Sequence, residues 1–275
     1  MPLTLSAGKR DLVLHPIWTN AAGMLGFSDE AARFVDLAQL GALVTNPVSL
    51  APRTPARGPR ILTYRGGLLL HTGHPNPGLR AVLRDHRRRW KGLPCPVIVH
   101  VLAGSPEEAA RIAEQLEAID EVAGLEIGLG AAEPHSVAAM VAACAAAQKP
   151  VLALVPVTSA PEVIQAAGSA GAAAVVLGPP RGSLPGPGGA PIQGRLYGPA
   201  VYPLTLRAIT LLAASSPCAL IAGAGVYSQA DVGALLAAGA AAVQFDTVLW
   251  TEPEVALPSP AAMANSARRE MQGPA

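Results

Sequence analysis

Three stretches of the chain repeat one junction: LGALV at residues 40–44, AGAAAVV at 170–176 and AGAAAVQF at 238–245. In each, a segment rich in alanine or leucine reaches a glycine, and a short apolar run follows. Glycine at this point accepts the left-handed backbone that closes a helix, and the apolar run is typical of a buried parallel strand. The repeat therefore predicts a chain built from β-strand and α-helix units.

The same alternation of short apolar runs and longer amphipathic stretches extends to eight pairs. Ser28, Ser105 and Ser228 are placed to cap the first free N–H groups of their helices. We expect strands at residues 17–22, 42–46, 97–102, 125–129, 151–155, 173–177, 219–222 and 241–245. We expect helices at residues 28–40, 77–90, 106–119, 134–148, 160–170, 199–214, 228–238 and 260–271.

Eight such units in 275 residues favour a closed (β/α)8 TIM barrel over an open doubly wound sheet, with residues 1–275 as a single domain. Residues 3–15 predict a β-hairpin that covers the bottom of the barrel. A functional site is expected at the carboxyl ends of the strands. Two long loops lead from strands there, residues 47–76 and 178–198, and the second, rich in Gly and Pro, predicts a lid or a mobile surface loop.

Composition restricts the partners. The chain is 51% hydrophobic, which excludes disorder, and its net charge of +1 creates no field that would attract nucleic acid or acidic membranes. Three cysteines cannot form a disulfide framework, and the first residues lack the pattern of a signal peptide. No His or Cys motif predicts a metal site. We expect a cytoplasmic protein that binds a small molecule, with neither a nucleic acid nor a membrane as partner.

Several motifs follow one another in a specific order. Asn20-Ala-Ala-Gly23 follows the first expected strand, and Gly41 to Thr45 is followed by Pro52-Arg53 and Pro59-Arg60. Further along the chain are Gly66-Gly67 through Asn76-Pro77-Gly78, then Leu196-Tyr-Gly-Pro-Ala200, residues 222–226 and residues 239–247. In this order and spacing they resemble the class 1 dihydroorotate dehydrogenases, which are FMN-binding (β/α)8 barrels and are expected to be homodimers.

The resemblance implies positions for the cofactor and the substrate. The cofactor-binding positions would be Ala21, Ala22, Gly23, Asn46, Gly223, Ala224, Gly225, Asp246 and Thr247. The substrate-binding positions would be Leu70, Thr72, Gly73 and Asn76.

The chain departs from that family where the chemistry takes place. Asn46 stands where the family has a lysine, the strand at 151–155 has no lysine, and Leu70 replaces a substrate-binding asparagine. Residues 128–133 replace the family segment that carries the catalytic base, and Ala131 cannot act as a base. Standard dihydroorotate oxidation is therefore not expected. The catalytic residues stay unassigned, with His71 and His74 as candidates for a relocated base.

Three functions remain open at this point. The chain is an oxidoreductase-family barrel with an altered site, a non-catalytic barrel that binds a metabolite or a subunit, or an active dehydrogenase with a relocated base. Asp246 stands at a family glycine in the phosphate turn, and its charge predicts weakened or lost FMN binding. The alternative is that Asp246 turns outward, to cap the helix at Ser228 or to pair with an arginine. For His100 we expect a hydrogen-bonded core residue, and for Glu126 a structural role. Arg181, Arg195 and Tyr197 could bring charge and a hydroxyl to the pocket, or their loop could leave them exposed at the surface.

Overall fold

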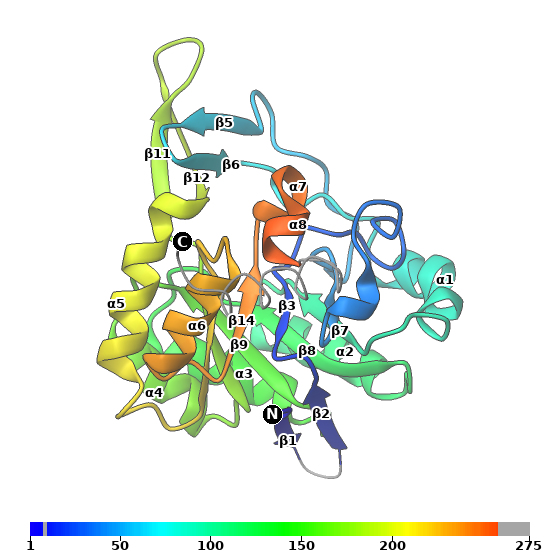
Figure 1. Cartoon of the computed structure of the whole chain (residues 1–275). Coiled ribbons are helices and arrows are strands. Elements are labelled where there is room, and N and C mark those ends of the chain that lie inside the picture. Colours follow the sequence, from blue (N-terminus) through cyan, green and yellow to red (C-terminus); the bar gives the residue numbers. More distant parts are fainter. Residues whose placement is uncertain (8–9, 258–275) are drawn as a thin grey trace.

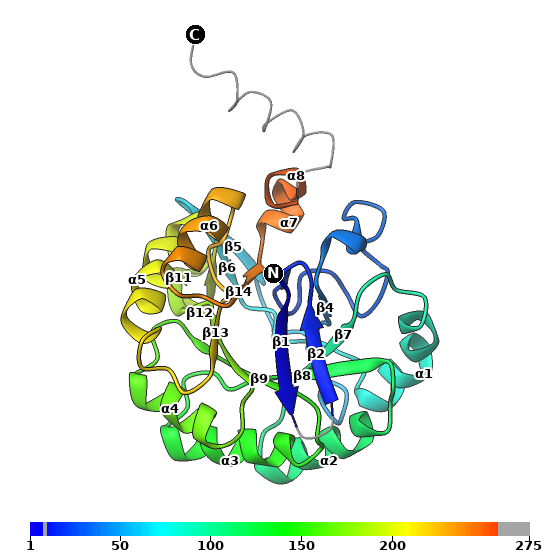
Figure 2. The same cartoon turned by 60° about the horizontal axis from the view of Figure 1, so that its bottom comes forward.

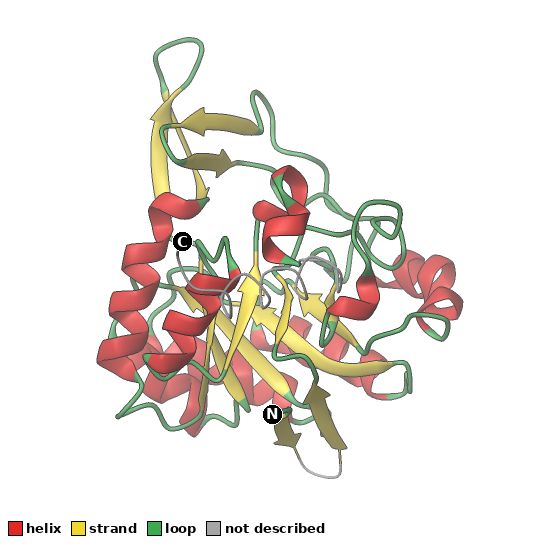
Figure 3. Cartoon of the chain, in the orientation of Figure 1, coloured by secondary structure: helices red, strands yellow, loops and turns green. Residues whose placement is uncertain are grey.

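The computed structural model describes residues 1–7 and 10–257, and its centre is a ring of eight parallel strands surrounded by helices (Figures 2 and 3). The strand order is β3-β14-β13-β10-β9-β8-β7-β4, so neighbours in the chain are neighbours in the sheet. This confirms the (β/α)8 TIM barrel. The strands are β3 (Trp18–Asn20), β4 (Leu43–Val44), β7 (Val97–Val101), β8 (Val122–Gly128), β9 (Val151–Pro156), β10 (Ala174–Gly178), β13 (Ala219–Ala222) and β14 (Ala242–Phe245).

The seam between the first and last strands of this order is closed by a side chain. The amide of Asn20, at the end of β3, donates to Val44 O at 2.6 Å and accepts from Val44 N at 2.9 Å. Asn20 is fully buried, and β4 is only two residues long. The side-chain amide has an acceptor oxygen and a donor nitrogen, so it makes the two hydrogen bonds that the backbone of a neighbouring strand would make at the seam.

The helices lie outside the ring. They are α1 (Leu79–Trp90), α2 (Pro106–Glu117), α3 (Pro134–Ala145), α4 (Pro161–Ser169), η2 (Pro199–Val201) with α5 (Tyr202–Leu212), α6 (Gln229–Ala237), α7 (Val248–Thr251) and α8 (Pro253–Ala256). Ser105 and Ser228 cap α2 and α6 as predicted, each accepting from a backbone N–H three residues on. No described helix is long and apolar enough to cross a membrane.

The expected helix at residues 28–40 is wrong. The segment forms turns and then one short 3-10 helix, η1 (Leu37–Gln39), whose cap is Asp36. Ser28 does not cap a helix, because its own N–H donates to the Glu30 carboxylate at 2.6 Å and its hydroxyl bonds to neighbouring carboxylates. Side chains here bind the local backbone in competition with helix formation. The expected helix at residues 260–271 lies outside the described residues.

The N-terminal hairpin covers the bottom of the barrel, as predicted (Figure 2). Strands β1 (Leu3–Ala7) and β2 (Arg10–Leu14) pair antiparallel. Leu5, Leu12 and Leu14 are almost completely buried in one cluster with inward-facing strand residues such as Ile98 and Val176. The lower end of the barrel is therefore packed with side chains and leaves the upper end for a site.

The two long loops are not irregular lids. Each contains a hairpin, β5 (Ile61–Tyr64) with β6 (Gly67–Leu70), and β11 (Arg181–Pro185) with β12 (Pro191–Tyr197). Strands β6 and β12 pair antiparallel, which joins the hairpins into one four-stranded sheet above the barrel (Figure 1). We call this sheet the cap. Gly67 is required at the junction, since an added Cβ would overlap the carbonyl oxygen of Tyr197.

Candidate functional site

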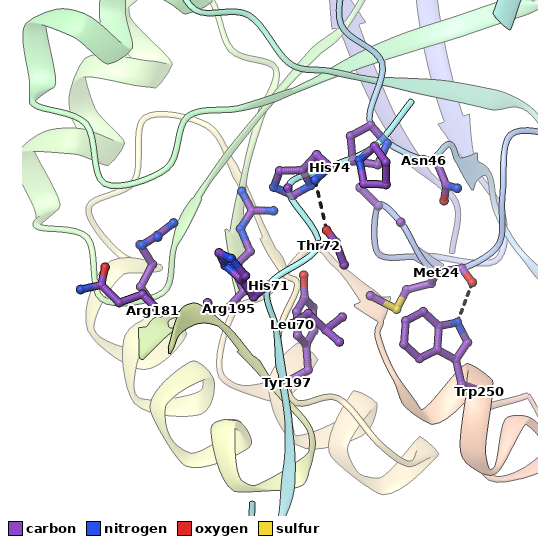
Figure 4. A pocket seen from close by; sticks show the side chains of 17 residues that line it. Met24, Asn46, Leu70, His71, Thr72, His74, Arg181, Arg195, Tyr197 and Trp250 are labelled. Carbon is purple, nitrogen blue, oxygen red and sulfur yellow. Dashed lines mark hydrogen bonds between the residues drawn. The ribbon is translucent and has the colours of Figure 1, made fainter. Parts of the chain in front are cut away.

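A cavity of about 350 Å³ lies between the carboxyl ends of the barrel strands and the cap. Its walls come from the turns after β3 and β4, from residues 70–75, from the hairpin β11–β12 and from α7. In Figure 4, Arg181 and Arg195 lie on one side of the cavity and Met24 and Trp250 on the other. The volume is in the range of small-molecule pockets.

The cavity gathers eight of the predicted site residues: Ala22, Gly23, Asn46, Leu70, His71, Thr72, Gly73 and His74. The other predicted positions do not line it: Ala21, Asn76, Gly223, Ala224, Gly225, Asp246 and Thr247. Asn76 is buried, and its amide holds the loop by accepting from Ser49 N and Gly78 N and donating to His74 O. Its contacts are structural.

The two histidines differ in what they can do. Burial, followed by the charges of Arg195, His100, Arg53 and Arg181, lowers the pKa of His74 to about 3. His74 is therefore neutral at pH 7, and its affinity for a proton is too low for an efficient general base. His71 also lines the cavity, on the segment that follows β6, and its backbone N–H donates to Arg60 O.

Two arginines give the cavity a positive charge. Arg181 and Arg195 are directly opposite each other in the β11–β12 ladder, and both line the cavity. Within residues 1–7 and 10–257, neither forms an ion pair with a carboxylate. An unpaired guanidinium facing a pocket is suited to bind a carboxylate or phosphate group of a ligand.

The sequence did not place several lining residues in a site, among them Met24, Gln193 and Trp250. Trp250, in the first turn after β14, donates its indole N–H to Met24 O at 2.7 Å and so joins two walls of the cavity. Its position directly after the last strand was a usable signal, because that end of every strand faces the mouth. The position of Gln193 depends on cap pairing and had no local signal.

A buried polar cluster is formed by side chains of β7, β8 and β14. Glu126 accepts from His100 Nδ1 at 2.7 Å and from Gln244 Nε2 at 2.6 Å, and all three residues are at most 1% exposed. His100 is thus a hydrogen-bonded core residue, as predicted, and Glu126 joins side chains of β7 and β14. An added Cβ at Gly128 would lie 2.8 Å from His100 Nε2, so the imidazole takes the space that a side chain at position 128 would need.

Asp246 is fully buried at the turn after β14. Its carboxylate accepts from Gly225 N at 2.9 Å, from Thr247 N, and from Thr247 Oγ1 at 3.1 Å. Both outward alternatives are therefore wrong: Asp246 does not reach solvent or an arginine, and α6 is capped by Ser228 with Asp231. Backbone N–H groups after strands seven and eight are the phosphate donors of such barrels. Here they already bind a carboxylate, so this turn does not fit the phosphate of FMN.

Comparison with known proteins decides the family. The family model described as Dihydroorotate dehydrogenase matches residues 12–173, more than half of the chain. The chain belongs to the dihydroorotate dehydrogenase family. It is 34% identical over 265 residues to the dihydroorotate dehydrogenase B (NAD(+)) catalytic subunit of Trichlorobacter lovleyi, covering 88% of this chain and 86% of that one. The corresponding subunit of Pelobacter propionicus is 34% identical over 262 residues, covering 87% and 85%.

A solved structure supports the fold. The dihydroorotate dehydrogenase of Eimeria tenella, in complex with ferulenol, matches with a TM-score of 0.76 at 14% identity, covering 97% of this chain and 85% of that one. Ala131 lies on an exposed turn after β8 and does not line the cavity.

Proposed function

We propose that this member of the dihydroorotate dehydrogenase family binds a small ring compound with a carboxylate group, of the dihydroorotate type, and does not oxidise it by a flavin-dependent reaction. The observation that carries the proposal is the pair Arg181 and Arg195, which face the cavity without a carboxylate partner among the described residues. Asn46 and Thr72 add polar groups that suit the amide edges of such a ring.

We expect no oxidation because neither Ala131 nor His74 can act as the base that the reaction needs. Oxidation of a ring carbon requires a base within hydrogen-bond reach, with a pKa suited to removing the proton. Ala131 has no such group, and His74 has a pKa of about 3 because of burial and the surrounding positive charges. The turn that would hold the FMN phosphate contains Asp246.

An active FMN-dependent dehydrogenase is the second candidate, and His71 is the observation that favours it. Its side chain lines the cavity, as Figure 4 shows. Under this alternative the purified protein carries FMN, dihydroorotate bleaches the flavin without oxygen, and His71→Asn abolishes the bleaching. Under our proposal there is no flavin absorbance to bleach.

Calorimetric titration tests the binding site. Orotate carries the carboxylate, and uracil is the same ring without it, so the wild type should bind orotate more tightly than uracil. Arg195→Ala should weaken orotate binding about tenfold or more, because a charge-assisted hydrogen bond contributes roughly 1.5–3 kcal/mol. Arg111→Ala, at an exposed position of α2, is the matched control and should leave the affinity unchanged. Equal orotate affinity in Arg195→Ala and the wild type refutes the proposed site.

The proposal also includes a homodimer in the cytoplasm, with no nucleic acid or membrane partner. Leu204 and Leu211 of α5 are 47% and 61% exposed, which is consistent with a protein interface on this helix. Sedimentation at micromolar concentration should give the mass of two chains, and Leu211→Glu should shift it toward one chain.

A further inference from the structure

The carboxylate of Asp246 lies at the junction of three chain segments. It accepts from the N–H of Gly225 after β13 and from the N–H of Thr247 after β14. Burial raises the pKa of Asp246, and hydrogen bonds from Gly225, from Thr247 and from the backbone of Gly198, which precedes η2, oppose that shift. No cation pairs with Asp246 among the residues that the structure describes. The carboxylate is thus held by backbone N–H donors and the Thr247 hydroxyl, much as a bound anion is held in a nest of amides.

Glycines near this carboxylate allow neighbouring segments of the chain to approach one another closely. Gly225 has φ +71°, and an added Cβ would overlap the backbone N of Tyr202 at the start of α5. An added Cβ at Gly223 would lie 2.6 Å from Val176. A turn in which glycines let N–H groups converge on one point is the usual construction of a phosphate site in a barrel of this kind.

We propose that Asp246 is an internal substitute for a bound phosphate: its carboxylate occupies the anion position of the turn and so excludes phosphate and FMN from the wild-type protein. Two effects produce the exclusion. The N–H of Gly225 and the N–H of Thr247 each have one hydrogen to donate, and both already donate to Asp246. A phosphate at the same amides would also lie beside a like charge in a buried, poorly screened environment.

The substitution has a consequence for stability. In a barrel that depends on phosphate, these N–H groups lack a partner until the ligand binds. Here the protein supplies its own acceptor, so the turn is complete without a ligand. Removal of the carboxylate should therefore both destabilise the protein and make it respond to phosphate.

The test compares the wild type with Asp246→Gly in buffer, in inorganic phosphate and in FMN. The melting temperature of the wild type in about 10 mM phosphate should equal its melting temperature in sodium chloride of the same ionic strength. Asp246→Gly should melt at a lower temperature in buffer and should be stabilised by phosphate. Its affinity for phosphate and FMN, from calorimetry and flavin fluorescence, should exceed that of the wild type about tenfold or more.

Asp231→Gly is the matched control. Asp231 also accepts backbone N–H groups, those of Tyr227 and Ser228, but it does so at the start of α6 and not in the turn after β14. It should be destabilised without a specific phosphate response. If Asp246→Gly does not fold, Asp246→Ser provides a hydroxyl acceptor without the charge and should show the same phosphate response.

Three results would overturn the proposal. They are stabilisation of the wild type by phosphate, purification of the wild type with stoichiometric FMN, and equal phosphate responses in Asp231→Gly and Asp246→Gly. Failure of orotate to bind would contradict the proposed function at Arg195 but would leave the wild-type phosphate result unchanged. Orotate binding and the phosphate response of Asp246→Gly therefore distinguish the two proposals, whereas stoichiometric FMN in the wild type would contradict both.

Discussion

Asn20 offers a sharp test of how the barrel closes. Its side-chain amide bonds to Val44 N at 2.9 Å, to Val44 O at 2.6 Å and to Ala21 O at 3.0 Å, all in a fully buried position. Asn20→Ala leaves the N–H and the C=O of Val44 without these partners. Each buried group left unpaired costs roughly 1–3 kcal/mol, so the free energy of unfolding should fall by about 4 kcal/mol.

Two further variants make the Asn20 result specific. Asn20→Asp keeps an acceptor for Val44 N but directs a carboxylate oxygen at Val44 O, so it should be at least as destabilising as Asn20→Ala. Gln115→Ala removes an exposed amide on α2 and should change the free energy of unfolding by less than about 0.5 kcal/mol. Urea unfolding followed by circular dichroism measures all three. A loss below about 1 kcal/mol in Asn20→Ala would refute closure by this side chain.

Three other predictions concern titration and the cap. The pKa of His74 is about 3 in the folded protein and about 6.5 when unfolded, so the free energy of unfolding should fall as pH falls from 6.5 toward 3. In urea unfolding at pH 5, His74→Asn should remove up to about 2 kcal/mol of that loss. His135→Asn, at an exposed site, should not. Burial lowers the pKa of Lys149 to about 8 from its unfolded value near 10.4, so stability should rise between pH 8 and 10, and the rise should be absent in Lys149→Met. Gly67→Ala should separate β6 from β12, increase proteolysis of the cap and weaken orotate binding, whereas Gly188→Ala, with open space around it, should not.

The prediction of the barrel rested on local sequence signals, namely glycines at helix ends and serines at helix starts. Gly171 and Gly239 both have positive φ, as predicted for the helix-to-strand junctions, and the caps at Ser105 and Ser228 form as expected. The junction at Gly41 was predicted wrongly: Gly41 has no positive φ, and glycine is needed there because an added Cβ would overlap the carbonyl oxygen of Pro16. The prediction failed at Ser28, because the carboxylate of Glu30 bonds to the Ser28 N–H. Which of two local hydrogen-bonding patterns forms there depends on side-chain positions that a spacing rule does not specify.

The site was predicted only where it follows from strand ends. His71 and His74 lie at the cavity because their segment precedes α1 and crosses the barrel mouth. The sequence left Arg181 and Arg195 open between the pocket and the surface, because their place at the cavity depends on pairing between β6 and β12, whose residues are more than 120 positions apart in the chain. The inward direction of Asp246 is set by N–H groups of Gly225 and Thr247 that only the closed barrel brings together.

The most direct test of the proposed function is the visible absorbance spectrum of the freshly purified protein, recorded before and after anaerobic addition of dihydroorotate. We expect no flavin bands before the addition, no change after it, and binding of orotate by calorimetry in the same preparation. Stoichiometric FMN that dihydroorotate bleaches would contradict the proposal and establish the chain as an active dehydrogenase.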